Sequence, residues 1–115
     1  MADVTDLEAA REKLQAERAR LLDEMAETVQ TPGQMTYGSQ AAAASHVFEQ
    51  QRDLALRDRA RQHLEQVDAA LARLDEGTFG TCLRCRKPIA NERLGALPWA
   101  AHCIDCQREL DRGRG

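Results

Sequence analysis

The sequence predicts a mainly α protein: an antiparallel two-helix coiled-coil hairpin with a small C-terminal four-cysteine zinc-finger module. Three observations predict this fold. Leucines recur every seven residues within 3–30, a Pro-Gly pair at 32–33 interrupts the helical pattern, and two CxxC pairs lie near the C-terminus of the 115-residue chain. We expect the hairpin to occupy residues 1–76, with its tip at about 31–42. The module is expected at 77–115, ending in a short helix.

Residues 3–30 are predicted to form the first helix, because they hold no Gly or Pro and carry one narrow apolar seam. Charged side chains cover the remaining faces. At about 1.5 Å per residue the helix spans roughly 40 Å. The seam residues are Val4, Leu7, Ala10, Leu14, Leu21, Met25 and Val29.

The second helix is predicted to begin at Ser39, which can act as N-cap, and to end at Leu74 or Asp75, before Gly77. Its middle, around Asp58 and Arg61, is polar, so we expect looser packing there. Two long helices joined by a short loop fold back on each other as a rod. The apolar seam of this helix is predicted to be Val47, Leu54, Leu64, Val67, Leu71 and Leu74.

The charge is mild, with a formal net value of −3, and it is shared unevenly. Residues 1–75 carry 9 basic and 14 acidic side chains, whereas residues 76–115 carry 7 and 5. This balance argues against nucleic-acid binding by bulk electrostatics. Residues 1–30 lack an apolar run and no segment approaches a membrane span, so a cytoplasmic protein without membrane contact is expected.

The cysteines predict one structural zinc ion per chain, held by Cys82, Cys85, Cys103 and Cys106. Each CxxC turn points two thiolates at one metal, and four thiolates leave no position for a substrate water. Zinc binding would supply folding free energy that so small a module cannot gain from apolar burial. The alternatives are two disulfides, a redox-active CxxC, or His102 replacing one cysteine as ligand.

The other residues of note have simpler interpretations. Phe79 and Trp99 are predicted to form the small core of the module, with a base-stacking platform as the alternative. His46 and His63 are expected on the helices, solvated or partly packed. No His/Asp/Glu cluster or phosphate loop is present, so we expect no enzyme.

The stretch 74–106, LDEGTFGTCLRCRKPIANERLGALPWAAHCIDC, resembles the DksA/TraR family of C4-type zinc-finger regulators. The matching pieces are FG-x-C-x-x-C, then I-x-x-x-RL-x-A-x-P, then CIDC. The resemblance extends over about residues 40–106. It implies a protein that binds RNA polymerase without contacting DNA directly and inserts its hairpin into the secondary channel, altering initiation, often together with ppGpp. The zinc module would hold the base of the hairpin.

The chain departs from that family at the hairpin tip. The best-known members carry a DxxDxA motif, and alignment from the cysteines places Ser39 and Ala42 at the two aspartate positions. Tip action through carboxylates near the catalytic magnesium is therefore not expected. The predicted partner-binding residues of the tip are Gln34, Met35, Thr36, Tyr37, Ser39 and Ala42.

The positions that the resemblance assigns to ppGpp contacts also differ. Arg59 and Arg93 remain basic and are the predicted partner-binding residues at the base. Where other cations are expected, the chain has Gln62, Gln66, Leu97 and Gln107. We expect little or no response to ppGpp.

Two functions follow from these residues. The first is a transcription regulator that binds RNA polymerase through its secondary channel. The alternative is a zinc-stabilised coiled-coil adaptor that binds another protein, which the acid-free tip favours. Direct nucleic-acid binding through the basic module is a further alternative.

Overall fold

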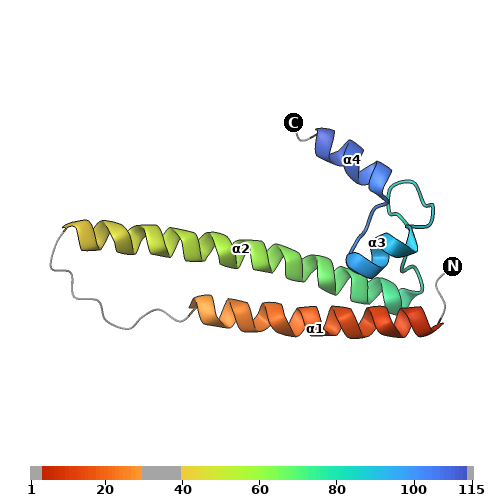
Figure 1. The fold of residues 1–115 in the computed structure, drawn as a ribbon, viewed down its shortest axis with the longest axis horizontal. Coiled ribbons are helices and arrows are strands. Elements are labelled where there is room, and N and C mark those ends of the chain that lie inside the picture. Colours follow the sequence, from red (N-terminus) through yellow and green to blue (C-terminus); the bar gives the residue numbers. More distant parts are fainter. Residues whose placement is uncertain (1–3, 30–39, 114–115) are drawn as a thin grey trace.

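The computed structural model describes residues 4–29 and 40–113, which form four helices (Figure 1). Two are long, α1 (Val4–Val29) and α2 (Gln40–Glu76), and two are short, α3 (Asn91–Ala96) and α4 (Ile104–Gly113). The described residues contain no β-strand, only an isolated antiparallel bridge between Thr81 and Pro88. None of the described helices has the length and apolar composition needed to cross a membrane.

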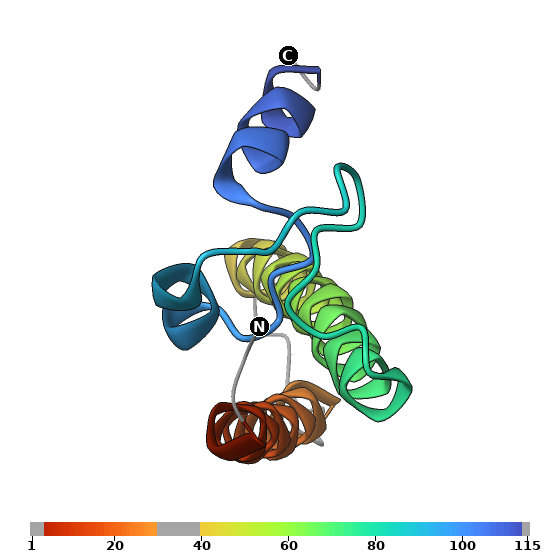
Figure 2. The ribbon, with the colours of Figure 1, turned by 90° about the vertical axis from the view of Figure 1, so that its right-hand side faces the viewer.

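The two long helices lie side by side and antiparallel, as the sequence predicted (Figures 1 and 2). Their shared core is apolar, with Leu14 and Val67 fully buried. Ala60 and Ala70 are also buried in this cluster, and such small side chains let the two helix backbones approach closely. Leu14, Leu21, Ala60, Val67 and Ala70 make up the buried cluster.

Two ion pairs at the edges of this seam show the register of the two helices. The guanidinium of Arg11 donates to Asp75, and that of Arg18 donates to Asp68, both over 2.8 Å. These pairs are exposed and add little stability. They are seven residues apart on both helices, so they indicate one unbroken register along the base of the hairpin.

The predicted seam of α2 is wrong at Val47 and Leu54. These side chains are 50% and 62% exposed. Leu54 lies six residues before the buried Ala60, and six residues turn an α-helix by about 600°, which places Leu54 roughly 120° away from the seam. The heptad pattern predicted from Val47 and Leu54 therefore follows a different face of α2 from the face of Ala60 and Val67, which packs against α1.

Beside the polar middle of α2, where looser packing was expected, the structure has a shallow pocket of about 280 Å³. Met25 of α1 and Leu54 of α2 supply its apolar lining. The rest of the lining is charged, from Arg57, Asp58 and Arg61.

The second helix ends one or two residues later than expected, and Gly77 ends it as predicted. Gly77 has φ +80°, a left-handed conformation that costs glycine little. Its N–H donates to the Leu74 carbonyl over 3.4 Å, and the Thr78 N–H donates to the Arg73 carbonyl over 2.9 Å. This pair of bonds is a Schellman motif, which satisfies the last carbonyls of the helix. The division into two domains at this point stays a prediction.

The C-terminal module follows at the base of the hairpin (Figure 2). It has a core of its own, formed by Cys82, Ile89, Leu94, Ala100 and Cys106. Phe79 packs against this cluster, as predicted, and also against the hairpin cluster. The prediction for Trp99 is wrong, because its side chain packs against the hairpin core. Trp99 therefore joins the two parts of the molecule.

The predicted tip residues Gln34, Met35, Thr36, Tyr37 and Ser39 lie outside the described residues, and Ala42 lies in the first turn of α2.

Candidate metal centre and its junction with the hairpin

The first cysteine pair sits in a tight turn. The Cys82 N–H donates to the Lys87 carbonyl over 2.9 Å, and the Arg86 N–H donates back to the Cys82 carbonyl over 3.0 Å. Arg86 closes this turn with φ +65°, which is unfavourable for a residue with a Cβ atom. This strained residue therefore lies in the turn that directs the thiols of Cys82 and Cys85 toward the same point.

The second pair lies at the start of α4. Cys103 precedes the helix and Cys106 is in its first turn, where the Gln107 N–H donates to the Cys103 carbonyl over 2.9 Å. One further backbone bond, from the Leu83 N–H to the Ala101 carbonyl over 2.9 Å, holds the two cysteine segments together.

All four Sγ atoms lie within 4.8 Å of one another. The Cys85 and Cys103 sulfurs are 3.8 Å apart. Zn–S bonds of about 2.3 Å in a tetrahedron place neighbouring sulfurs about 3.8 Å apart, so this separation suits one zinc ion. Among the described residues, His102 is not part of the cluster; its carbonyl accepts a bond from the Arg93 Nε over 3.0 Å.

The surroundings of the sulfurs favour one thiolate, at Cys82. Burial by itself raises the pKa of the Cys82 thiol, but backbone N–H groups of Cys85, Cys103 and Arg84 donate to it and lower the pKa to about 5. Burial and contact with the neighbouring thiols raise the pKa of Cys106 to about 12. The Cys82 thiolate therefore forms readily, whereas a second thiolate beside it, at Cys106, is disfavoured. A bound divalent cation removes that repulsion.

Arg84 connects this centre to the outer side of α4. Its guanidinium pairs with Glu109, which raises the pKa of Arg84 and lowers that of Glu109, and it also contacts the Cys106 sulfur. A cation at this position offsets the negative charge that four thiolates retain around one zinc ion.

A junction that the sequence did not reveal joins the module to both long helices. The ring of His63 on α2 meets that of Trp99 edge to face, with centroids 4.3 Å apart. The His63 Nε2 donates to the Glu17 carboxylate of α1 over 2.8 Å. Glu17 also accepts two bonds from Arg20, over 2.8 and 3.0 Å. His63 was expected to be merely solvated or partly packed, because contacts between distant residues leave no periodic signal.

Arg73 makes a second contact between α2 and the C-terminal module, which the sequence did not indicate. Its side chain is buried, and its guanidinium approaches the carbonyls of Trp99 and Ala100 at 3.4 and 3.5 Å. Burial lowers the pKa of Arg73, with Glu76 acting in the opposite direction. The guanidinium of Arg73 thus contacts the backbone just before the second cysteine pair, Cys103 and Cys106.

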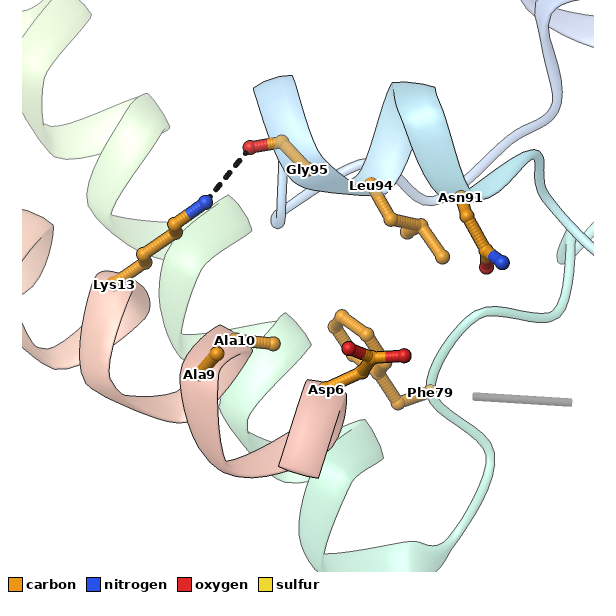
Figure 3. A pocket seen from close by; sticks show the side chains of 8 residues that line it. All are labelled: Asp6, Ala9, Ala10, Lys13, Phe79, Asn91, Leu94 and Gly95. Carbon is orange, nitrogen blue, oxygen red and sulfur yellow. Dashed lines mark hydrogen bonds between the residues drawn. The ribbon is translucent and has the colours of Figure 1, made fainter. Parts of the chain in front are cut away.

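A third contact lies between α1 and α3 (Figure 3). The Lys13 ammonium donates to the Gly95 carbonyl over 3.2 Å. Beside it is a small pocket of about 170 Å³ with an apolar lining, in which Leu94 of α3 faces Ala10 and Phe79 across the pocket. Asp6 and Lys13 of the same helix face lie at its rim (Figure 3).

A wider groove, of about 700 Å³, runs between α2, the loop 97–102 and α4. It brings together five of the positions that the family resemblance assigns to ppGpp contacts, although these positions are far apart in the sequence. Arg59 is not among its lining residues. The five positions gathered here are Gln62, Gln66, Arg93, Leu97 and Gln107.

Comparison with known proteins agrees with this architecture. Residues 77–112 match the family model of the prokaryotic dksA/traR C4-type zinc finger. The RNA polymerase-binding transcription factor DksA of Caulobacter vibrioides is 32% identical over 108 residues, which are 92% of this chain and 76% of that protein. An uncharacterized protein of Aquifex aeolicus is 40% identical over 52 residues, and the match spans only 36% of its length.

The similarity extends to the fold. The structure of the transcription factor DksA2 from Pseudomonas aeruginosa superposes with a TM-score of 0.80 and 29% sequence identity, covering 98% of this chain and 89% of that one. The family match and the four clustered thiols together indicate zinc binding. The hairpin, the cysteine cluster and these similarities show that the chain belongs to the DksA/TraR family.

Proposed function

We propose that this chain is a non-enzymatic transcription regulator that binds RNA polymerase and inserts its helical hairpin into the secondary channel. The observation that carries the proposal is the match over almost the whole chain to a protein named for RNA polymerase binding. The shape supports it, since the molecule measures 61 × 33 × 20 Å and its long helices form a narrow rod. Such a protein acts in the cytoplasm, where the polymerase is.

In this proposal the four cysteines hold one zinc ion per chain, and its role is structural. The thiolates of Cys82, Cys85, Cys103 and Cys106 fill a tetrahedral shell, so no position remains for a reacting water. Zinc fixes the loop that carries Trp99, and Trp99 packs against the hairpin. The metal would thereby hold the C-terminal module in place against the base of the helical hairpin.

The regulator we propose acts without acidic side chains at the two aligned tip positions, Ser39 and Ala42. Its effect on initiation then comes from occupying the channel rather than from carboxylates brought to the catalytic magnesium. Partner contacts at Gln34, Met35, Thr36 and Tyr37 belong to the same proposal.

We further propose that its activity is largely independent of ppGpp. A polyphosphate needs several free cations, and the wide groove has glutamine at 62, 66 and 107. Its two arginines already donate to carbonyl groups, Arg73 to Trp99 and Ala100, and Arg93 to His102. The carboxylate of Glu65 adds negative charge to the lining. Arg59 and Arg93 then serve as contacts to the polymerase.

The decisive experiment is co-purification of the full chain with core RNA polymerase, in competition with a known secondary-channel factor. We expect stoichiometric binding that the competitor displaces, and altered initiation in a transcription assay. Adding ppGpp should change the measured affinity by less than about twofold. A ppGpp-dependent gain of tenfold or more would contradict the independence while leaving polymerase binding intact.

The acid-free tip favours one second candidate, a zinc-stabilised coiled-coil adaptor for another protein. Failure to bind core polymerase under conditions where the competitor binds would support the adaptor and contradict the proposed regulator.

A further inference from the structure

Two charged side chains outside the cysteine cluster, Arg84 and Glu109, connect the two halves of the metal centre. Arg84 belongs to the turn of the first cysteine pair, and Glu109 lies on α4, three residues after Cys106. The Arg84 guanidinium donates to the Glu109 carboxylate and also to the Cys106 sulfur. Arg84 therefore contacts the second half of the centre at two points, although it belongs to the first half.

The helix that carries Cys106 has few other attachments. Figures 1 and 2 show α4 extending away from the two long helices, which pack against each other. In the described part of the chain, one backbone hydrogen bond joins the two cysteine segments, from the Leu83 N–H to the Ala101 carbonyl. The position of α4 relative to the first cysteine pair therefore depends mainly on the metal ligands and on Arg84.

The two contacts of Arg84 differ in their surroundings. The side chains of Arg84 and Glu109 are 46% and 55% exposed, and water screens an ion pair of this kind, which contributes little to stability. Cys106 is buried, with 7% of its surface exposed. A positive charge beside a buried sulfur is screened less by water. The contact with the sulfur is therefore the more consequential of the two.

The two buried sulfurs receive their hydrogen bonds from different sources. The Cys82 sulfur accepts bonds from the backbone N–H groups of Cys85, Cys103 and Arg84. At the Cys106 sulfur, the donor from outside the cysteine cluster is the Arg84 side chain. A side chain can be replaced without changing the backbone, so the support of Cys106 depends on the identity of one residue.

We propose that Arg84, held by Glu109, is a positioning residue that slows the release of zinc by keeping Cys106 and α4 at the metal. Four thiolates around one Zn²⁺ leave a local charge of −2, and the guanidinium offsets part of it at Cys106. When one Zn–S bond opens, the same side chain keeps α4 close, so that the bond can form again. The inference rests on the zinc centre of the proposed function, but it does not depend on polymerase binding.

The test measures the rate at which the full zinc-loaded chain transfers Zn²⁺ to an excess of a chromophoric chelator. The variants are Arg84→Gln, Glu109→Gln and the exchange Arg84→Glu/Glu109→Arg. The matched control is Arg108→Gln, which removes an exposed cation from the same helix, two residues after Cys106. Elemental analysis gives the zinc content before each measurement, and far-UV circular dichroism checks that each variant folds.

We expect Arg84→Gln to release zinc about tenfold faster than wild type, because changes in residues that support metal ligands have effects of this size. Glu109→Gln should accelerate release by about threefold, since Arg84 keeps its charge but loses the group that holds it. The control should stay within about twofold of wild type, because Arg108 does not support a ligand.

The exchange variant separates this role from that of a simple ion pair. It keeps opposite charges at 84 and 109 but places a carboxylate beside Cys106, so we expect release at least as fast as in Arg84→Gln. Release at the wild-type rate in the exchange variant would show that the ion pair alone matters and would overturn the proposal. An equal acceleration in Arg108→Gln would assign the effect to net charge and also overturn it.

A spectroscopic measurement tests the contact with the sulfur directly. With Co²⁺ in place of zinc, loss of a hydrogen bond to a thiolate should shift the thiolate-to-metal charge-transfer band to longer wavelength. We expect this shift in Arg84→Gln and not in Arg108→Gln, and an unshifted band in Arg84→Gln would contradict the proposal. Wild-type chain that holds no zinc would overturn the metal centre itself. Failure to bind polymerase, by contrast, changes none of these measurements.

Discussion

At the scale of single residues, the cysteine turn depends on a conformation that most side chains avoid. Arg86 is left-handed, and it closes the loop from Cys82 to Cys85. A β-branched residue in this region is considerably more strained than arginine, whereas glycine is unstrained.

We therefore expect Arg86→Val to weaken zinc affinity by about 1–2 kcal/mol, or roughly five- to thirtyfold. Arg86→Gly should stay close to wild type. Competition with a chromophoric chelator measures both values. Lys87→Val is the control, because it removes a neighbouring exposed cation at a position with ordinary φ. An equal loss in Lys87→Val would show that charge, not backbone strain, is responsible.

Individual residues also show how far the sequence can be interpreted. The metal cluster was predictable, because two CxxC pairs constrain one another locally and their chemistry is specific. His63, Trp99 and Arg73 were not recognised, since each acts through a partner tens of residues away. Ala60 and Ala70 were missed because alanine looks neutral in a sequence although it occupies the seam.

At the scale of the elements, the helix bounds were predictable and the pairing of faces was not. Proline and glycine mark helix ends locally, so both long helices came out within about two residues of the structure. The seam of α2 depends on which of its two apolar stripes meets α1. On the helix, Leu64, Val67 and Leu71 lie within about 40° of Ala60 and roughly 80° or more from Val47 and Leu54, so the heptad counted from Val47 follows a face that does not pack.

The contact between α1 and α2 contains one group whose charge matters. Hydrogen bonds from Arg20 lower the pKa of Glu17 to about 2, aided by a bond from His63 and opposed by burial. A carboxyl whose pKa is lower in the folded state stabilises the fold above its unfolded value of about 4.5. That stabilisation is lost as the pH falls toward 2.

We expect Glu17→Gln to lower the free energy of unfolding at pH 7 by about 1 kcal/mol, because it removes charge-assisted bonds to Arg20 and His63. Between pH 5 and 2 the wild type should lose more stability than the variant. Urea unfolding followed by circular dichroism at several pH values measures both curves. Glu24→Gln is the control, since Glu24 accepts a single bond from the exposed Arg20. Parallel curves for wild type and Glu17→Gln would contradict this account.

At the scale of the whole molecule, the zinc module and the rod are joined at a few points on one end. Trp99, Arg73 and Lys13 make contacts between them, and two of these involve the loop that precedes Cys103. The hairpin in turn has its own buried seam, with Leu14 and Val67 fully enclosed. Loss of the metal should therefore affect the joint more than the rod.

Trp99 is the single tryptophan of the chain, so its fluorescence reports on that joint directly. Chelation of zinc removes the constraint on residues 97–103, and the indole should leave His63 for water. We expect a red shift of the emission, while far-UV circular dichroism loses no more than the share of the six-residue α3 and ten-residue α4. Adding zinc back should restore the emission. Unchanged emission once all four thiols react with a thiol reagent would show that Trp99 docks without the metal, and that the rod, rather than the zinc centre, fixes the base of the molecule.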